Sequence, residues 1–181
     1  MFVIQSGSKL EGSVSRTKLK GFSMAKRKVF ISYHHANEQT VVDNFVNKYS
    51  DEYDVFTDSS IDRAADSDDT EYLARVCRES IEGTSVTIVM IGKKTGKRKF
   101  VDWEIRYTLE KEHGLVGISR PGLDSSDASV PARLTDNRNS GYAKWYTYPS
   151  TASGLKSMID EAYDASVSKI DNSRPKKKQN G

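Results

Sequence analysis

The sequence lacks most of the features that mark secreted, membrane and metal-binding proteins. It has one cysteine, which excludes an intramolecular disulfide and a cysteine-ligated zinc site. Cys77 lies among apolar residues at helical spacing, so we expect it in the core rather than as a nucleophile. No stretch approaches the roughly 20 apolar residues of a membrane span, and the first 28 residues hold no continuous apolar segment typical of a secretory signal. We therefore predict a cytoplasmic protein without a membrane span.

Apolar residues are also scarce, at 36% of the 181 residues, which indicates that part of the chain lies outside the core. Residues 1–28 hold seven basic residues and one acid, and residues 174–181 hold four basic residues and no acid. The net charge of +3 therefore hides a body, residues 29–173, with 17 basic and 24 acidic residues. Such a body repels a phosphate backbone, so we expect no specific nucleic-acid binding.

The length fits one domain with two tails. We predict a basic, flexible N-terminal extension over residues 1–24 and a single α/β domain over residues 25–171. Residues 172–181 are basic and polar, and we expect them to form a disordered C-terminal tail.

Strand and helix patterns alternate along the predicted domain. Apolar, β-branched and aromatic runs predict four strands and an edge strand that Pro149 ends, at residues 29–33, 53–56, 85–91, 115–118 and 143–148. Apolar residues at helical spacing predict helices near residues 37–49, 71–82, 101–109 and 155–170. Residues 119–140 are rich in Ser, Asp and Asn, which indicates a long loop.

This alternation is typical of right-handed βαβ units. The run at 85–91 is apolar on both faces, which suits the centre of a parallel sheet covered on both sides. We predict a three-layer, flavodoxin-like, doubly wound sheet of five parallel strands in the order 2-1-3-4-5. Ligands of such folds bind outside the carboxyl ends of the strands, near the switch point of the strand order. Functional residues should therefore follow the first three strands.

Several motifs are compatible with other chemistry but are incomplete. His34-His35 suggests a metal site, yet no third ligand at metal spacing is visible, and we expect no metal. The segment Gly92–Arg98 resembles a phosphate loop. However, only three residues separate its two glycines and Arg98 replaces the Ser or Thr of that motif, so ATP hydrolysis is not indicated.

Four segments, taken in order and spacing, resemble the successive boxes of a TIR domain: residues 29–33, 55–58, 86–91 and Trp103-Glu104. The similarity is strongest to the TIR-like proteins of the Thoeris anti-phage defence system. These also share the basic start at residues 24–27, the Thr-Ser-Val-Thr of residues 84–87 and the Glu-Lys pair of residues 110–111. The resemblance covers about residues 24–118.

The resemblance implies an enzyme that cleaves the nicotinamide–ribose bond of NAD. The product is ADP-ribose or a cyclic isomer that activates a partner effector. NAD is then the substrate, no cofactor is tightly bound, and a phage-derived trigger and a second copy of the chain are candidate partners. Glu104 falls on the family's catalytic glutamate. The candidate substrate-binding residues are Phe30, Ser32, Tyr33, His34, Asp58 and Trp103.

A carboxylate suits this chemistry because loss of nicotinamide leaves an oxocarbenium-like ribose that a negative charge stabilises. Exclusion of water would favour attack within the same molecule over hydrolysis, which makes residues 119–140 a candidate lid. The five basic residues from Lys93 to Lys99 either neutralise the NAD pyrophosphate or form a solvated surface run.

Structural roles compete for the same residues. Glu104 lies near a helix N-terminus, where the macrodipole favours any carboxylate, and Phe30 and Trp103 also fit the core. Tyr33 fits either role, and Asp58 fits a turn that it caps itself.

Three other functions remain as alternatives. A non-enzymatic interaction module predicts no NAD turnover and partner binding that survives loss of Glu104. A receiver domain needs an aspartate after the third strand, which Met90-Ile91-Gly92 does not supply. A deoxyribosyltransferase would act on free nucleosides.

Residues 59–69 are acidic and lack the glycine common in the TIR loop that mediates assembly, which weighs against TIR-style self-association.

Overall fold

The computed structural model describes residues 26–56 and 70–181. The predicted N-terminal extension, Asp58 and the acidic stretch after it lie outside the described residues. No helix in the described ranges is long and apolar enough to cross a bilayer.

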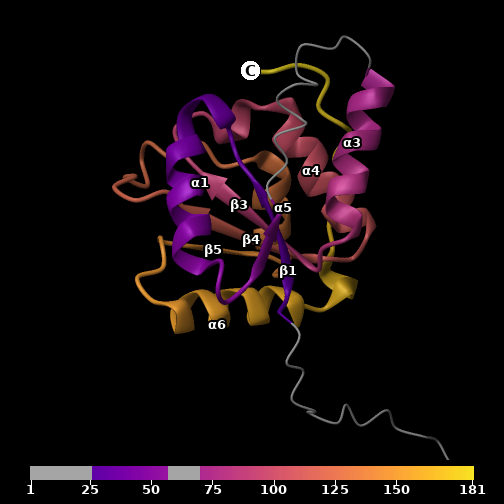
Figure 1. The fold of residues 1–181 in the computed structure, drawn as a ribbon. Helices are drawn as coiled ribbons and strands as arrows, with labels where there is room; N and C mark the ends of the chain where they lie inside the picture. Colours follow the sequence, from indigo (N-terminus) through magenta and orange to yellow (C-terminus); the bar gives the residue numbers. More distant parts are fainter. Residues whose placement is uncertain (1–25, 57–69) are drawn as a thin grey trace, which may run out of the picture.

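A parallel sheet forms the centre of the molecule (Figure 1). Its strands run side by side in the order β2-β1-β3-β4-β5, and every neighbouring pair is parallel. The strands are β1 (Lys28–Ser32), β2 (Asp54–Phe56), β3 (Val86–Ile91), β4 (Gly114–Ser119) and β5 (Lys144–Tyr146). Every residue of β3 and β4 is buried, as expected for central strands with helices on both faces.

Helices cover both faces of the sheet. The helices are α1 (His35–Tyr49), α3 (Thr70–Glu82), α4 (Lys99–Glu110), α5 (Ala132–Asn139) and α6 (Ala152–Tyr163), with short 3-10 turns η1 (Thr95–Lys97) and η2 (Val167–Lys169). Helices α1 and α6 pack against one face, where Phe45 and Ile159 meet Ile31 and Ile88. Helices α3, α4 and α5 cover the opposite face. The prediction of an α/β fold with a parallel sheet between helices is confirmed.

The predicted long loop at residues 119–140 is wrong in its second half, where α5 forms. This helix has almost no apolar stripe, so its sequence reads as a loop. Its buried residues are Leu134 and two fully buried polar residues, Arg133 and Asn137. Arg133 forms an ion pair with Asp102 of α4, with Nε 3.1 Å from Oδ1, and the Asn137 amide donates to the Asp171 carbonyl at 2.7 Å.

The closing helix also differs from the prediction. We expected it to run to Ile170, but α6 ends at Tyr163. The chain then turns through η2, and Ile170 packs with the apolar cluster on the opposite face of the sheet. Its apolar character therefore reflects a separate contact and not a continuing helical stripe.

Residues 172–181, here named the C-terminal strap, are not the disordered tail that their composition predicted. The strap lies along α4 and holds it through hydrogen bonds to the backbone and to side chains. The Lys177 N–H donates to Asp102 at 3.0 Å, and the Lys99 N–H at the start of α4 donates to the Asn180 side chain at 2.9 Å. The basic composition of the strap predicted a solvated tail. Composition does not show that the strap forms hydrogen bonds with α4, a distant element of the chain.

Candidate functional site

A buried hydrogen bond joins the end of β1 to α4. Ser32 is the last residue of β1 and is fully buried, and Glu104 lies in the middle of α4 with 5% of its surface exposed. The Ser32 hydroxyl donates to the Glu104 carboxylate, with Oγ 2.5 Å from Oε2. A charge-assisted bond of this length is among the stronger polar contacts in proteins, so it fixes the carboxylate against the carboxyl end of the sheet.

A second chain of hydroxyls fixes the helix that carries Glu104. The Thr108 hydroxyl, one turn further along α4, donates to the Glu104 carbonyl at 2.8 Å. The hydroxyls of Thr108 and Thr87 on β3 lie 2.7 Å apart, and both side chains are fully buried. Together these contacts fix α4 to the two central strands β1 and β3.

Two predicted substrate contacts lie in the core beside this pair. Phe30 is 1% exposed and packs with Cys77 of α3 and with Trp103 of α4, so it lies in the core between the sheet and these two helices. Trp103 is 3% exposed, and its indole N–H donates to the Lys177 carbonyl of the strap at 2.7 Å. The Lys176 ammonium lies 3.4 Å from the centre of the indole ring. The strap therefore covers the ring that we predicted as a substrate contact.

The residues that follow Ser32 lie on the α1 side of the sheet. Tyr33 belongs to the core under α1 and α6, and its hydroxyl donates to Gln39 at 2.9 Å. The His34 ring approaches Glu38 of α1, with Nδ1 3.7 Å from Oε2. The structure therefore brings Ser32, Glu104, Phe30 and Trp103 together on one face, and it places Tyr33 and His34 on the other.

A polar cluster that the sequence did not reveal lies at the same carboxyl edge. Glu38 in the first turn of α1 is 1% exposed, and Arg98 and Arg120 follow β3 and β4. Burial raises the pKa of the Glu38 carboxyl, and the charges of Arg120 and Arg98 oppose that rise. Glu38 occupies an ordinary first-turn position for an acid, so only its burial distinguishes it.

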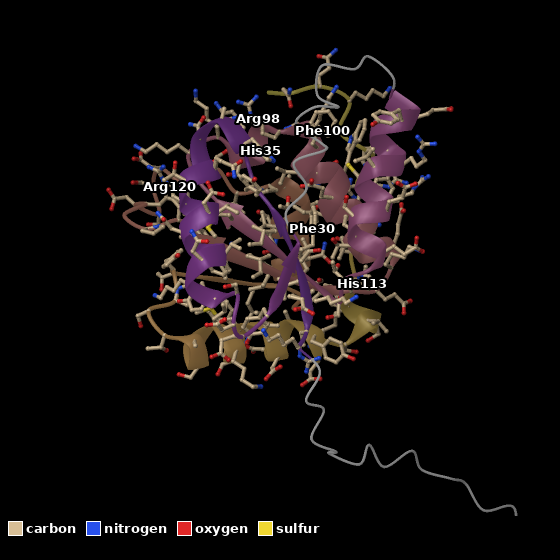
Figure 2. The ribbon with its side chains drawn as sticks, viewed as in Figure 1. Phe30, His35, Arg98, Phe100, His113 and Arg120 are labelled. Carbon is tan, nitrogen blue, oxygen red and sulfur yellow. The ribbon has the colours of Figure 1, made fainter. Side chains whose placement is uncertain are left out.

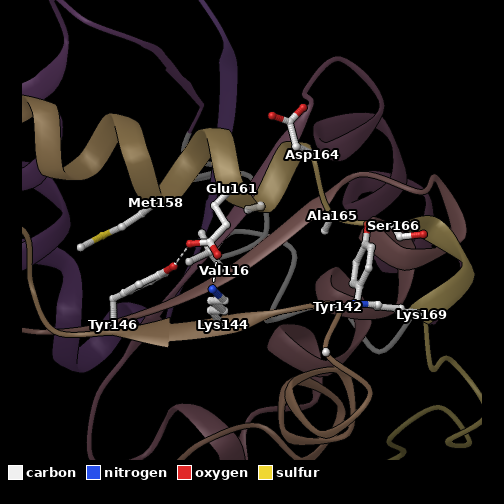
Figure 3. A pocket seen from close by; sticks show the side chains of 12 residues that line it. Val116, Tyr142, Lys144, Tyr146, Met158, Glu161, Asp164, Ala165, Ser166 and Lys169 are labelled. Atoms are coloured by element: carbon white, nitrogen blue, oxygen red, sulfur yellow. Dashed lines mark hydrogen bonds and ion pairs between the residues drawn. The ribbon is translucent and has the colours of Figure 1, made fainter.

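Two sizeable hollows lie away from the Ser32–Glu104 pair. One, of about 610 Å³, lies between β5 and α6, where Lys144 and Tyr146 both bind Glu161 (Figure 3). It faces the last turn of α6, which packs on the start of β4 and hence on the amino edge of the sheet. The other, of about 640 Å³, is a groove between α3 and α4 lined by Arg75, Arg78 and Lys176.

The fold and the buried Ser32–Glu104 pair define a TIR-like α/β domain with a glutamate at the carboxyl edge of a parallel sheet. The family model described as "Thoeris protein ThsB, TIR-like domain" matches residues 30–125, more than half of the chain. The chain therefore belongs to the Thoeris ThsB TIR-like family. The match begins on β1 and includes Glu104 but ends before α5 and the strap.

One curated relative extends this comparison. The chain is 33% identical over 103 residues to a Bacillus cereus (strain MSX-D12) protein named "Putative cyclic ADP-D-ribose synthase ThsB1". The aligned region covers 52% of this chain and 52% of that protein, so the chain spans about half the length of its relative.

Proposed function

We propose that this protein cleaves NAD at the nicotinamide–ribose bond and forms a cyclic ADP-ribose-type signal, which activates a Thoeris effector. The observation that supports this proposal most strongly is the buried Ser32–Glu104 hydrogen bond at the carboxyl edge of the sheet. Ligands of open parallel sheets bind at that edge. Membership of the Thoeris ThsB family and the name of the relative, a putative cyclic ADP-D-ribose synthase, also support the proposal.

Glu104 has a clear role in this reaction. As the C1′–N bond breaks, nicotinamide leaves as a neutral ring with the bonding electron pair, and positive charge develops on the ribose. A fixed carboxylate stabilises that charge without having to reorganise, because Ser32 already orients it. An adenine nitrogen or a ribose hydroxyl of the same molecule then bonds to C1′, which closes the ring. The proton released to solvent comes from the exocyclic amine of adenine or from that hydroxyl.

The experiment is chromatography and mass spectrometry of NAD incubated with lysates of phage-infected cells that express the protein. The test variant is Glu104→Gln. The matched control is Glu110→Gln, an exposed glutamate on the same helix that pairs with Arg106. We expect a nucleotide with the mass of cyclic ADP-ribose with the wild type and the control, and none with Glu104→Gln.

A non-enzymatic interaction module is the second candidate, and the low exposure of Glu104 favours it. In this second candidate, the role of the buried Glu104 carboxylate is purely structural, and its bond to Ser32 joins β1 to α4. Equal NAD profiles for the wild type and Glu104→Gln, with both proteins still protecting cells, would support the module. ADP-ribose as the sole product would indicate a hydrolase.

A further inference from the structure

Glu38 is a buried acid without a hydrogen bond among the residues that the structure describes. It is 1% exposed, and neither carboxylate oxygen accepts a hydrogen bond within those residues. The nearest basic atom in an ion pair with it is His34 Nδ1, 3.7 Å from Oε2. Burying a charged group without partners is costly, so an acid kept in such a place indicates a function beyond packing.

Two arginines supply positive charge to the same place. Arg98 is the N-cap residue of α4, and Arg120 follows the end of β4. Both are half-buried, and in each the Nε donor is buried and has no acceptor among the described residues. The charges of both arginines act on the Glu38 carboxyl. Two cations against one acid leave the cluster positive, and the two Nε donors have no acceptor among residues 26–56 and 70–181.

The cluster lies at the switch point of the sheet. The strand order changes direction between β1 and β3, so the loops after these strands diverge there. His34 follows β1 and Gly92 follows β3, while Arg120 is tied to this edge because its N–H donates to the Ile91 carbonyl at 2.9 Å. Figure 2 shows Arg98 and Arg120 toward the end of the molecule opposite His113, which precedes β4.

The loop that carries Arg98 is rigidly held. The Gly92 N–H donates to the Thr95 hydroxyl at 2.9 Å, and the Gly96 N–H donates to the Ser129 carbonyl at 2.7 Å. Gly92 also lies against Glu38, because a Cβ there would be 2.0 Å from Glu38 Oε1. Thus the arginine is positioned by the fold rather than by a flexible surface run. Lys93 of the same run is instead exposed and paired with Asp127 at 2.7 Å.

Phosphate is the ligand that this chemistry fits. The guanidinium fork of arginine matches phosphate oxygens, which supply the acceptors that both Nε donors lack. Glu38 beneath them can accept a ribose hydroxyl. We infer that Arg98 and Arg120, with Glu38, bind the diphosphate-ribose portion of a dinucleotide. This inference rests on the proposed function, in which the glycosidic bond lies at Glu104. His34 follows Ser32 by two residues, so the Cα atoms of these two residues lie within about 7 Å of each other.

The test is calorimetric binding of ADP-ribose and of inorganic pyrophosphate to the full chain. ADP-ribose carries the diphosphate and both riboses but no nicotinamide, so the measurement does not depend on cleavage. Arg98→Gln and Arg120→Gln should each weaken ADP-ribose binding about tenfold, as expected for loss of one charged hydrogen bond, and the double variant about a hundredfold. The matched control is Arg27→Gln, which removes an arginine from the opposite edge, where it pairs with Asp160.

The results separate the inference from the proposed function. Arginine-dependent ADP-ribose binding that persists in Glu104→Gln supports the site even when NAD is never cleaved. ADP-ribose affinity that is unchanged in the double variant, or no measurable binding to the wild type, overturns the site even when NAD is cleaved. If the double glutamine variant does not fold, ADP-ribose binding is measured on the double variant Arg98→Lys, Arg120→Lys instead. This pair keeps both charges but loses the forks, and it should still bind severalfold more weakly than the wild type.

Discussion

Ser32 and Glu104 are both buried polar residues whose hydrogen bond lies between a strand and a helix. Replacing a buried donor leaves its acceptor desolvated and unpaired at that position, which costs more than the bond itself contributes. The same bond therefore serves both stability and the orientation of the carboxylate. Substitution at Ser32 can separate these two effects.

We expect Ser32→Ala to lower the free energy of unfolding by about 1–3 kcal/mol and NAD turnover by at least about tenfold. The control is Thr87→Val, which removes another buried hydroxyl bond, to Thr108, on the neighbouring strand. Urea denaturation should show similar losses for both variants, whereas turnover in infected-cell lysates should fall only in Ser32→Ala. Equal turnover in the two variants would contradict an orienting role for Ser32.

Glu38 gives a prediction for the dependence of stability on pH. Burial raises the pKa of its carboxyl above the ordinary value, with Arg120 and Arg98 opposing that rise. The folded chain therefore binds this proton more tightly than the unfolded chain does. The stability that this group contributes is full below the unfolded pKa and is lost as the pH rises through the folded pKa.

Glu38→Gln removes this titration. The free energy of unfolding of the variant, minus that of the wild type, should increase as the pH rises from about 4 toward neutrality. Urea denaturation of both proteins at a series of pH values measures this difference in the free energy of unfolding. Glu79→Gln, at an exposed glutamate on α3, serves as the control for loss of a glutamate charge. A difference for Glu38→Gln that decreases with pH would mean that the arginines outweigh burial.

At the scale of elements, the strap and α5 form one unit around α4. Arg133 is fully buried and contacts all three segments. It pairs with Asp102 of α4 and donates to the Asn172 side chain at 2.6 Å and the Pro175 carbonyl at 3.1 Å. Because the neighbouring residue Trp103 is also bound by the strap, removal of the strap should disturb α4 near Glu104.

Deletion of residues 172–181 should lower the free energy of unfolding by about 2 kcal/mol, since it removes the acceptor of the Trp103 indole and two of the acceptors of Arg133, which keeps only Asp102. The midpoint of thermal unfolding should then fall by about 4–8 °C. Tryptophan emission should shift to longer wavelength as the Trp103 indole meets water. Lys178→Ala changes strap charge without removing any of these contacts and is the control. An unchanged emission spectrum in the truncated chain would show that the strap does not cover Trp103 in solution.

At the scale of the whole molecule, one helical layer and the sheet meet closely where α6 crosses the start of β4. A Cβ on Gly114 would lie 2.7 Å from the backbone of Ala162. Gly92 makes an even shorter hypothetical contact, 2.0 Å, but with the flexible end of the Glu38 side chain. The Ala162 backbone cannot move away from Gly114 without shifting α6, whereas the Glu38 side chain can rotate away from Gly92.

Gly114→Ala should therefore destabilise the fold by about 1–3 kcal/mol, the usual cost of overpacking. Gly92→Ala should cost less, although it should displace Glu38 and weaken ADP-ribose binding. Gly83→Ala meets nothing within 4 Å and serves as the neutral control. Thermal unfolding of the three variants ranks them, and a Gly92→Ala that is less stable than Gly114→Ala would contradict this account.

The sequence by itself determined the layer architecture. The run at 85–91 carries apolar residues on both faces, and the amphipathic stripes that precede and follow it predict helices on both of its faces. Periodicity is a local property, so it can be read without coordinates. Periodicity also placed Ser32 at the end of a predicted strand, whereas Glu104 came from the resemblance to TIR domains. Neither showed that the two side chains touch across 72 positions.

Only the tertiary structure decided where polar side chains are buried. Arg133 is buried in α5, a helix where composition predicted a loop, and the strap binds α4 where charge predicted disorder. Glu38, Arg98 and Arg120 come from three separate loops and turns, and each looks like a solvent-exposed residue in its own segment. Charged side chains become buried only when partners distant in the chain meet, and no local pattern records such partners.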